Sequence, residues 1–269
     1  MTGKIIAFIF GSLIGSFLNV CIHRMPNNES VVWPSSHCPH CQKRIPAYDN
    51  IPFLSYILLS GKCRFCLKRI SLCYPLVELL TAVVFLVFFN CFGLSYDFFF
   101  YLIFACGLII ATFVDIKHRI IPDEVSIGGC VIGFILSTLK GVNLKPMSFN
   151  FHPALNSFLG IIIGGGIIYL VGVIFDFVYF KLLKRPPIQG ETESMGGGDV
   201  KFLAMIGAFL GWQMAVLTFF LAPFFASVIG IFNLVVKKDH TIPYGPFLAI
   251  ASLVSMFWFD KITRFLFGQ

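Results

Sequence analysis

Four aspartates inside or beside long apolar stretches, where an ionised side chain is costly to bury, map to one predicted side of a membrane. They are Asp115, Asp123, Asp176 and Asp199. Two carboxylates held together in a partly dehydrated site share one proton, so that the charged member activates water while the protonated member polarises a carbonyl group. The sequence therefore makes hydrolysis by a carboxylate pair a candidate chemistry.

Asp115 and Asp199 are the pair that the pattern favours. Asp115 ends one apolar stretch, and Asp199 follows Gly196-Gly197-Gly198 directly before another. Three glycines allow the backbone to approach a substrate or a second helix closely, and positive φ angles are available to them. Both aspartates are predicted at the same depth and on the same side of a membrane.

The other two aspartates have simpler explanations. Asp123 follows Pro122, and an acidic residue in a first helical turn satisfies exposed amides and the helix dipole. Asp176 can be an interfacial residue next to the basic segment 181–185.

Four cysteines form a second group with a chemical signature, two Cys-x-x-Cys pairs separated by 21 residues. They are Cys38, Cys41, Cys63 and Cys66. Four thiolates give the closed tetrahedral shell of a structural zinc ion, which would supply folding free energy to a segment too short to hold a core. The alternative is two disulfides, which the reducing compartment expected for this segment disfavours.

The remaining cysteines share no spacing and are interpreted as small apolar packing residues. They are Cys21, Cys73, Cys91, Cys106 and Cys130.

The elements that must position these groups are membrane helices. The chain of 269 residues is 57% hydrophobic and only 12% charged, with a mean hydropathy of +0.86. That is more apolar surface than a soluble domain of this length buries, and about 20 apolar residues span a bilayer as a helix. Apolar runs predict eight spans, at roughly 5–22, 74–92, 98–114, 124–139, 157–180, 200–211, 214–236 and 245–260. The expected fold is an all-α polytopic membrane protein of about eight transmembrane helices with a small cytoplasmic four-cysteine zinc-binding insert.

Three regions follow from these spans. Residues 1–22 form a first transmembrane helix, 23–73 the cytoplasmic zinc-binding insert, and 74–269 a helical bundle that carries the aspartates. Alternating the spans with both termini outside places 15 of the 20 lysines and arginines on the cytoplasmic side, as the excess of positive charge in cytoplasmic loops requires. The net charge of +7 is explained by this orientation, so nucleic-acid binding is not expected. Close helix packing is expected at Gly164-Gly165-Gly166.

The order of several short motifs resembles one family over nearly the whole chain. The motifs are Gly15-Ser16-Phe17-Leu18-Asn19-Val20, the Cys38 and Cys41 pair, Asp49-Asn50-Ile51-Pro52, Gly61-Lys62-Cys63-Arg64 with Cys66, Tyr74-Pro75-Leu76-Val77-Glu78, Asp115 with Ile120-Ile121-Pro122-Asp123, Gly196 to Lys201, and Ile242-Pro243-Tyr244-Gly245-Pro246-Phe247. The chain resembles the bacterial type IV prepilin peptidases, relatives of the Gly-x-Gly-Asp intramembrane aspartyl proteases.

The resemblance implies that Asp115 and Asp199 are the catalytic pair of an aspartyl endopeptidase. Members of the family remove a short basic leader from prepilins and pseudopilins of type IV pilus or type II secretion systems, after a glycine at the cytoplasmic membrane face. Those with the four-cysteine insert look bifunctional, since they also methylate the new terminal amine with S-adenosylmethionine. The resemblance further implies the bacterial inner membrane, with both termini periplasmic.

No glycine-rich nucleotide motif locates the methyl-donor site. Asp49, Asn50, Gly61 and Glu78 are candidates by resemblance alone, and a turn, a cap or an interfacial contact is the alternative for each. A transporter or channel with intramembrane aspartates, or a structural zinc-bearing assembly factor, would also fit such spans without the order of the motifs.

Overall fold

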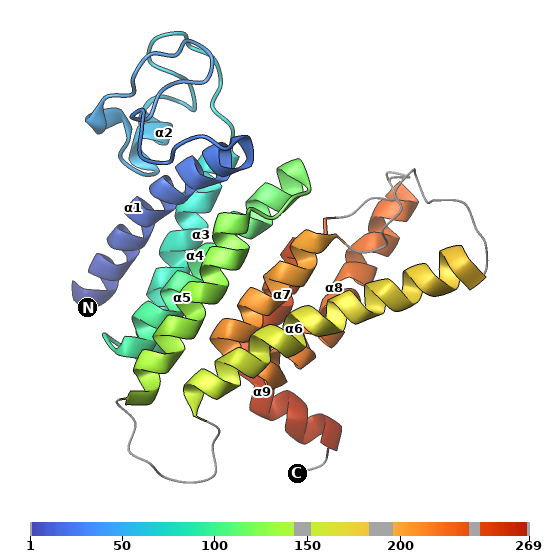
Figure 1. Cartoon of the computed structure of the whole chain (residues 1–269). Helices are drawn as coiled ribbons and strands as arrows, with labels where there is room; N and C mark the ends of the chain where they lie inside the picture. Colours follow the sequence, from blue (N-terminus) through green and yellow to red (C-terminus); the bar gives the residue numbers. More distant parts are fainter. Residues whose placement is uncertain (1, 143–151, 183–195, 237–242, 268–269) are drawn as a thin grey trace. The chain divides into compact units, whose positions relative to one another are not determined.

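The computed structural model describes residues 2–142, 152–182, 196–236 and 243–267, and these residues contain helices and no strand. The long helices are α1 (Thr2–Arg24), α3 (Cys73–Phe92), α4 (Tyr96–His118), α5 (Asp123–Val142), α6 (Pro153–Asp176), α7 (Gly197–Leu210), α8 (Trp212–Val236) and α9 (Gly245–Phe267) (Figure 1). Shorter elements are η1 (Met25–Asn27), η2 (Ala47–Asp49), α2 (Leu54–Leu58) and the π-helical η3 (Phe177–Leu182).

Each of the eight expected spans is a helix, so the all-α expectation is confirmed. Within the described residues, five helices are long and apolar enough to cross a membrane, namely α1, α3, α4, α6 and α9. α7 has only 14 residues, the apolar run Trp212–Val228 of α8 is shorter than a full span, and α5 carries Asp123, Glu124 and Lys140. Parts of the expected charged loops, at 183–195 and 237–242, lie outside the described residues.

The chain forms two compact units, Met1–Val114 and Asp115–Gln269. The first contains α1, the cysteine segment, α3 and most of α4, and the second contains α5 to α9 together with the last turn of α4. The division into 1–22, 23–73 and 74–269 stays a prediction.

In the first unit, α1 packs closely against α3 because glycines face it. A Cβ atom on Gly15 would lie 2.7 Å from the Cα of Glu78, and one on Gly11 would lie 2.8 Å from the Cα of Ala82. Helices approach this closely when small residues recur every fourth position. The buried Asn19 side chain also donates a hydrogen bond to the Tyr74 carbonyl, at 3.0 Å.

In the second unit, α7 packs against α5, α6, α8 and α9. Residues Phe202 to Leu210 are all buried, so α7 is the inner helix of this unit although it is the shortest of the long helices. Ser137 of α5 and Ser157 of α6 both donate hydrogen bonds to the carbonyl of Ala208, at 3.3 and 2.7 Å. These bonds between helices fix α7 between its neighbours.

Glycines allow the contact between α6 and α7. Gly160 and Gly207 face each other so closely that a Cβ atom on either would meet the backbone of the other. A Cβ on Gly164 would lie 2.6 Å from the Leu203 carbonyl oxygen, and one on Gly165 would lie 3.3 Å from the Ala204 Cβ. The expectation of close packing is therefore confirmed for Gly164 and Gly165, whereas a Cβ on Gly166 would meet no atom within 4 Å.

Candidate active site

Asp115 lies in the last turn of α4, and its side chain is buried with 6% of its surface exposed. Its Oδ2 atom accepts a hydrogen bond of 2.7 Å from the backbone N–H of Gly245, the first residue of α9. A charged carboxylate is stabilised at the N-terminus of a helix, where free N–H groups and the helix dipole converge. The second unit thus holds the Asp115 carboxylate at a defined point between two helices.

Asp199 lies in the first turn of α7, and its backbone N–H donates to the Gly196 carbonyl at 3.0 Å. The three preceding glycines do not use positive φ angles, so the expected conformational reason is wrong. What they provide is space. A Cβ on Gly197 would meet no atom within 4 Å, and one on Gly198 would only contact Ile121 at 3.4 Å, so the backbone here lies bare.

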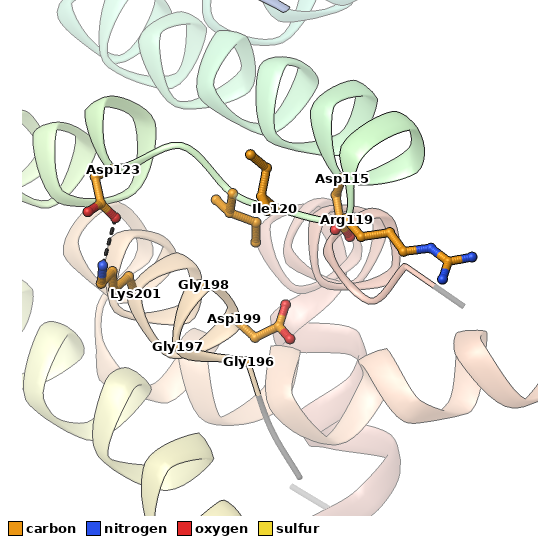
Figure 2. A pocket seen from close by; sticks show the side chains of 10 residues that line it. Asp115, Arg119, Ile120, Asp123, Gly196, Gly197, Gly198, Asp199 and Lys201 are labelled. Carbon is orange, nitrogen blue, oxygen red and sulfur yellow. Dashed lines mark hydrogen bonds and ion pairs between the residues drawn. The ribbon is translucent and has the colours of Figure 1, made fainter. Parts of the chain in front are cut away.

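The two aspartates line one pocket of about 320 Å³. Its walls are Asp115, Arg119, Ile120, Ile121, Asp123, Gly196, Gly197, Gly198, Asp199 and Lys201. Figure 2 shows that Asp115 comes from the end of α4 and Asp199 from the start of α7. The structure therefore brings together two carboxylates that are 84 positions apart in the chain, beside bare backbone on which an extended substrate could lie.

The pocket raises the pKa of the Asp199 carboxyl. Asp199 lies outside the five membrane-spanning helices, and burial raises its pKa to about 7, with a further contribution from the nearby charge of Asp115. Burial and the charge of Asp199 raise the pKa of the Tyr244 hydroxyl to about 12, so this phenol is neutral. Two carboxylates that cannot both ionise easily hold one proton between them near neutral pH.

The other two aspartates lie differently. Asp123 begins α5, and its Oδ1 accepts a hydrogen bond of 2.7 Å from the Lys201 Nζ, which also lines the pocket (Figure 2). Both side chains are substantially exposed, at 60% and 43%. Asp176 ends α6 and is not among the pocket residues. Residues 183–185 of the basic segment proposed as its neighbour lie outside the described residues.

The sulfur atoms of Cys38, Cys41, Cys63 and Cys66 all lie within 4.8 Å of one another, and the four thiols are free. The distance between the sulfurs of Cys38 and Cys66 is 3.8 Å. A tetrahedral zinc site with Zn–S bonds of about 2.3 Å separates its sulfurs by roughly this distance. The donor set and its spacing therefore fit a metal ion.

The two cysteine pairs have the same local backbone. Cys38 N–H donates to the Lys43 carbonyl and Cys63 N–H to the Lys68 carbonyl, at 3.0 and 2.9 Å. Gln42 and Leu67 occupy equivalent positions in the two turns, with φ angles of 58° and 56°. The backbone N–H of Cys66 is the main cause that lowers the pKa of the Cys63 thiol to about 7, which favours the thiolate that a metal binds.

Comparison with known proteins assigns the family. Residues 9–92 match the model of the bacterial peptidase A24 N-terminal domain, and residues 102–231 match that of the type IV leader peptidase family. A prepilin leader peptidase/N-methyltransferase from Stutzerimonas stutzeri is 34% identical over 96% of this chain and 91% of its own. Proteins of the same name from Aeromonas salmonicida and Pseudomonas aeruginosa are each 32% identical, over 96% and 95% of this chain and 92% and 90% of their own.

The chain belongs to the type IV leader peptidase family. It is therefore an enzyme of a membrane-protein family, as the resemblance predicted, and not a transporter or a structural assembly factor. The matched ranges include both aspartates and all four clustered cysteines. Comparison with the solved structures gives no significant match.

Three of the four residues that the resemblance offers for a methyl-donor site, Asp49, Asn50 and Gly61, lie in the cysteine segment. Asp49 forms a bidentate ion pair with Arg64, both distances being 2.6 Å, and the guanidinium lowers the pKa of its carboxyl group. Gly61 adopts a φ of +67° in a turn. Asn50 is exposed at the end of η2.

Glu78, the fourth candidate, is buried with 9% of its surface exposed. Its Oε2 accepts a hydrogen bond of 3.1 Å from the backbone N–H of Phe53, and the Ser16 hydroxyl is a further partner. Glu78 thus connects α3 to α1 and to the cysteine segment. Methyl-donor binding at Asp49, Asn50, Gly61 and Glu78 stays a prediction.

The five cysteines outside the cluster differ in burial. Cys21 is buried and packs as expected, whereas Cys73 and Cys91 are exposed on the protein, so packing within the chain does not explain these two. Cys106 and Cys130 are partly buried.

Sequence reasoning gave no role to three residues at the site. Gly245 binds Asp115, Lys201 pairs with Asp123, and Arg119 adopts a φ of 58° where α4 ends in the pocket wall. The signal for Gly245 was present, because Gly-Pro directly before an apolar run marks a helix start. Its partner could not be read from the sequence, since the two residues are 130 positions apart.

Proposed function

We propose that this enzyme is an aspartyl endopeptidase that removes the basic leader of type IV prepilins or pseudopilins after a glycine. The observation that carries the proposal is that Asp115 and Asp199 line one pocket at the ends of two helices, in a chain of the leader peptidase family. The relatives compared above carry prepilin leader peptidase in their names, which supports the substrate class.

The pair performs hydrolysis with one shared proton. The ionised carboxylate takes a proton from water as the water oxygen attacks the scissile carbonyl carbon. The protonated carboxyl donates to the carbonyl oxygen, which gives a tetrahedral diol. Collapse of the diol breaks the C–N bond and passes a proton to the departing amine, so that water is consumed and an acid and an amine are formed.

The position of the pocket suits a substrate held in a membrane. Asp115 ends a membrane-spanning helix, and the charged side chains of Arg119, Asp123 and Lys201 surround the same pocket. We propose that this end faces the cytoplasm of a bacterial inner membrane, because the orientation then satisfies the excess of positive charge in cytoplasmic loops, and that both termini are periplasmic. The apolar helix of the pilin would remain in the bilayer while its basic leader enters the pocket from the water side.

We propose zinc as the ion of the four-cysteine cluster, with a structural role because four protein ligands leave no open position. Cys38, Cys41, Cys63 and Cys66 would hold it, and their two turns would be fixed relative to each other. The names of the relatives also support N-methylation of the new terminal amine. When bound, S-adenosylmethionine would supply the methyl group for this step.

One reaction tests the proposed function. The purified enzyme in detergent is mixed with a full-length prepilin and S-adenosylmethionine, and the product is analysed by mass. We expect loss of the leader and a gain of one methyl group on the new terminal residue. An unchanged substrate mass with folded enzyme and a prepilin that a known relative cleaves would contradict the proposal.

A further inference from the structure

The amide of Gly245 meets Asp115 at the start of α9. Gly245 donates its N–H to Asp115 Oδ2 at 2.7 Å in a buried contact. Phe247 and Leu248 donate their N–H groups to the carbonyl of Tyr244, and Pro246 has none. The Gly245 amide is thus a free donor of this helix start, and it is directed at one of the two pocket carboxylates.

The contact needs glycine for reasons of space. A Cβ atom on Gly245 would lie 2.8 Å from Asp115 Oδ2 and 3.3 Å from both its Cβ and its Cγ. Carbon and oxygen atoms that are not bonded do not approach to 2.8 Å without repulsion, because optimal separations are about 3.5 Å or more. A side chain at this position would therefore push the carboxylate away from the amide.

Asp115 and Asp199 have different polar and charged groups around them. Arg119 directly follows α4, and its side chain lines the same pocket as Asp115. Asp123 and Lys201 form an ion pair with each other on the α5 and α7 side of the pocket. Tyr244 directly precedes α9 and is a neutral phenol close enough to Asp199 to be affected by its charge, and His118 follows Asp115 by three residues in α4. Asp115 therefore has an amide donor on one oxygen, whereas the charge that acts on Asp199 is the negative charge of Asp115.

We propose that Gly245 is a positioning residue whose amide holds Asp115 as the ionised, water-activating carboxylate, so that Asp199 is the protonated carboxyl that polarises the scissile carbonyl. The assignment rests on the proposed function and adds to it which carboxylate does what. In the reaction, Asp115 accepts the proton of the attacking water, and Asp199 donates its own to the carbonyl oxygen.

The first test compares the pH profiles of cleavage by Gly245→Ala and by Gly128→Ala. Gly128 lies in α5, and a Cβ there would meet no atom within 4 Å, so this variant is a matched control. Losing the hydrogen bond to the amide makes ionisation of Asp115 harder, so the acidic limb of kcat for Gly245→Ala moves to higher pH. The loss of a hydrogen bond to a charged group corresponds to about one to two pH units.

A purely structural defect at Gly245 would lower kcat at every pH and leave the limb in place, and that result would overturn the proposal. Gly128→Ala is expected to keep the profile of the wild-type enzyme.

The second test does not depend on activity or on the folding of the Gly245 variant. Infrared difference spectra of the full chain measure the protonated carboxyl band as a function of pH. We expect Asp199→Asn to lose the band that titrates near neutral pH. Asp115→Asn should keep a band that titrates at lower pH, because the negative charge next to Asp199 is gone.

The reverse pattern, with the band lost in Asp115→Asn and retained in Asp199→Asn, would overturn the assignment. If the bands are reversed and both variants are inactive in cleavage, only the division of roles is wrong. If both cleave normally, the proposed function itself fails.

Discussion

The partly buried Asp199 carboxyl should lower the stability of this enzyme at neutral and alkaline pH. Its folded-state pKa is raised from 3.8 to about 7, chiefly by burial. Below 3.8 the carboxyl is protonated in both the folded and the unfolded chain and contributes nothing. Between 3.8 and about 7 the folded chain binds more protons than the unfolded chain, so the free energy of unfolding falls as the pH rises.

The size of the effect follows from the shift. About three pH units at 1.36 kcal/mol each give a ceiling of roughly 4 kcal/mol. Asp199 is only partly buried and lines an open pocket, so solvent screening reduces this to roughly 1–3 kcal/mol. Asp199→Asn removes the titration, so the variant should be more stable than the wild-type enzyme at pH 8.

The assay is thermal unfolding in detergent at several values between pH 5 and pH 8. The Tm of Asp199→Asn minus that of the wild-type enzyme should rise by several degrees across this range and level off above about pH 7. Comparing the Tm difference at pH 5 with that at pH 8 cancels any effect of the substituted amide that does not depend on pH. Asp176→Asn is the control variant, measured in the same way. A Tm difference that stays constant or falls with pH would refute the reasoning.

Three further predictions concern packing, the metal and the division of the two activities. Gly207→Ala should lower the free energy of unfolding by roughly 1–3 kcal/mol, because its Cβ meets the α6 backbone, whereas Gly166→Ala should be neutral; equal Tm values would contradict this account of the contact. Metal analysis should find close to one zinc per chain, lost in Cys63→Ser and kept in Cys73→Ser, and a metal-free wild-type protein with disulfides in the cluster would defeat the zinc proposal. Cys63→Ser should lose methylation more than cleavage, and Asp199→Asn should still methylate a pre-cleaved pilin in a mass assay; failure of Asp199→Asn to do so would indicate a single shared site.

The sequence predicts the helices well because each apolar run must be a helix in lipid. It also places Asp115 and Asp199 at the ends of two helices, since both aspartates border such runs. The sequence predicts α7 as a short span, but its place as the inner helix of the second unit depends on the facing glycines of α6, which are far from it in the sequence.

The site was only partly predictable for a similar reason. The spacing of Cys38, Cys41, Cys63 and Cys66 brings their sulfurs together through two local turns, so the cluster follows from the sequence. The contact between Gly245 and Asp115 is tertiary, and no local pattern encodes it.

The central claim is that Asp115 and Asp199 together perform the cleavage, and leader removal by the two single amide variants tests it most directly. Asp115→Asn and Asp199→Asn, purified and shown to be folded, are assayed by mass on a full-length prepilin beside Asp176→Asn as the control. An amide cannot share the proton that the pair requires. We therefore expect no cleavage by either pocket variant and substantial cleavage by Asp176→Asn, and normal turnover by Asp115→Asn or Asp199→Asn would contradict the account.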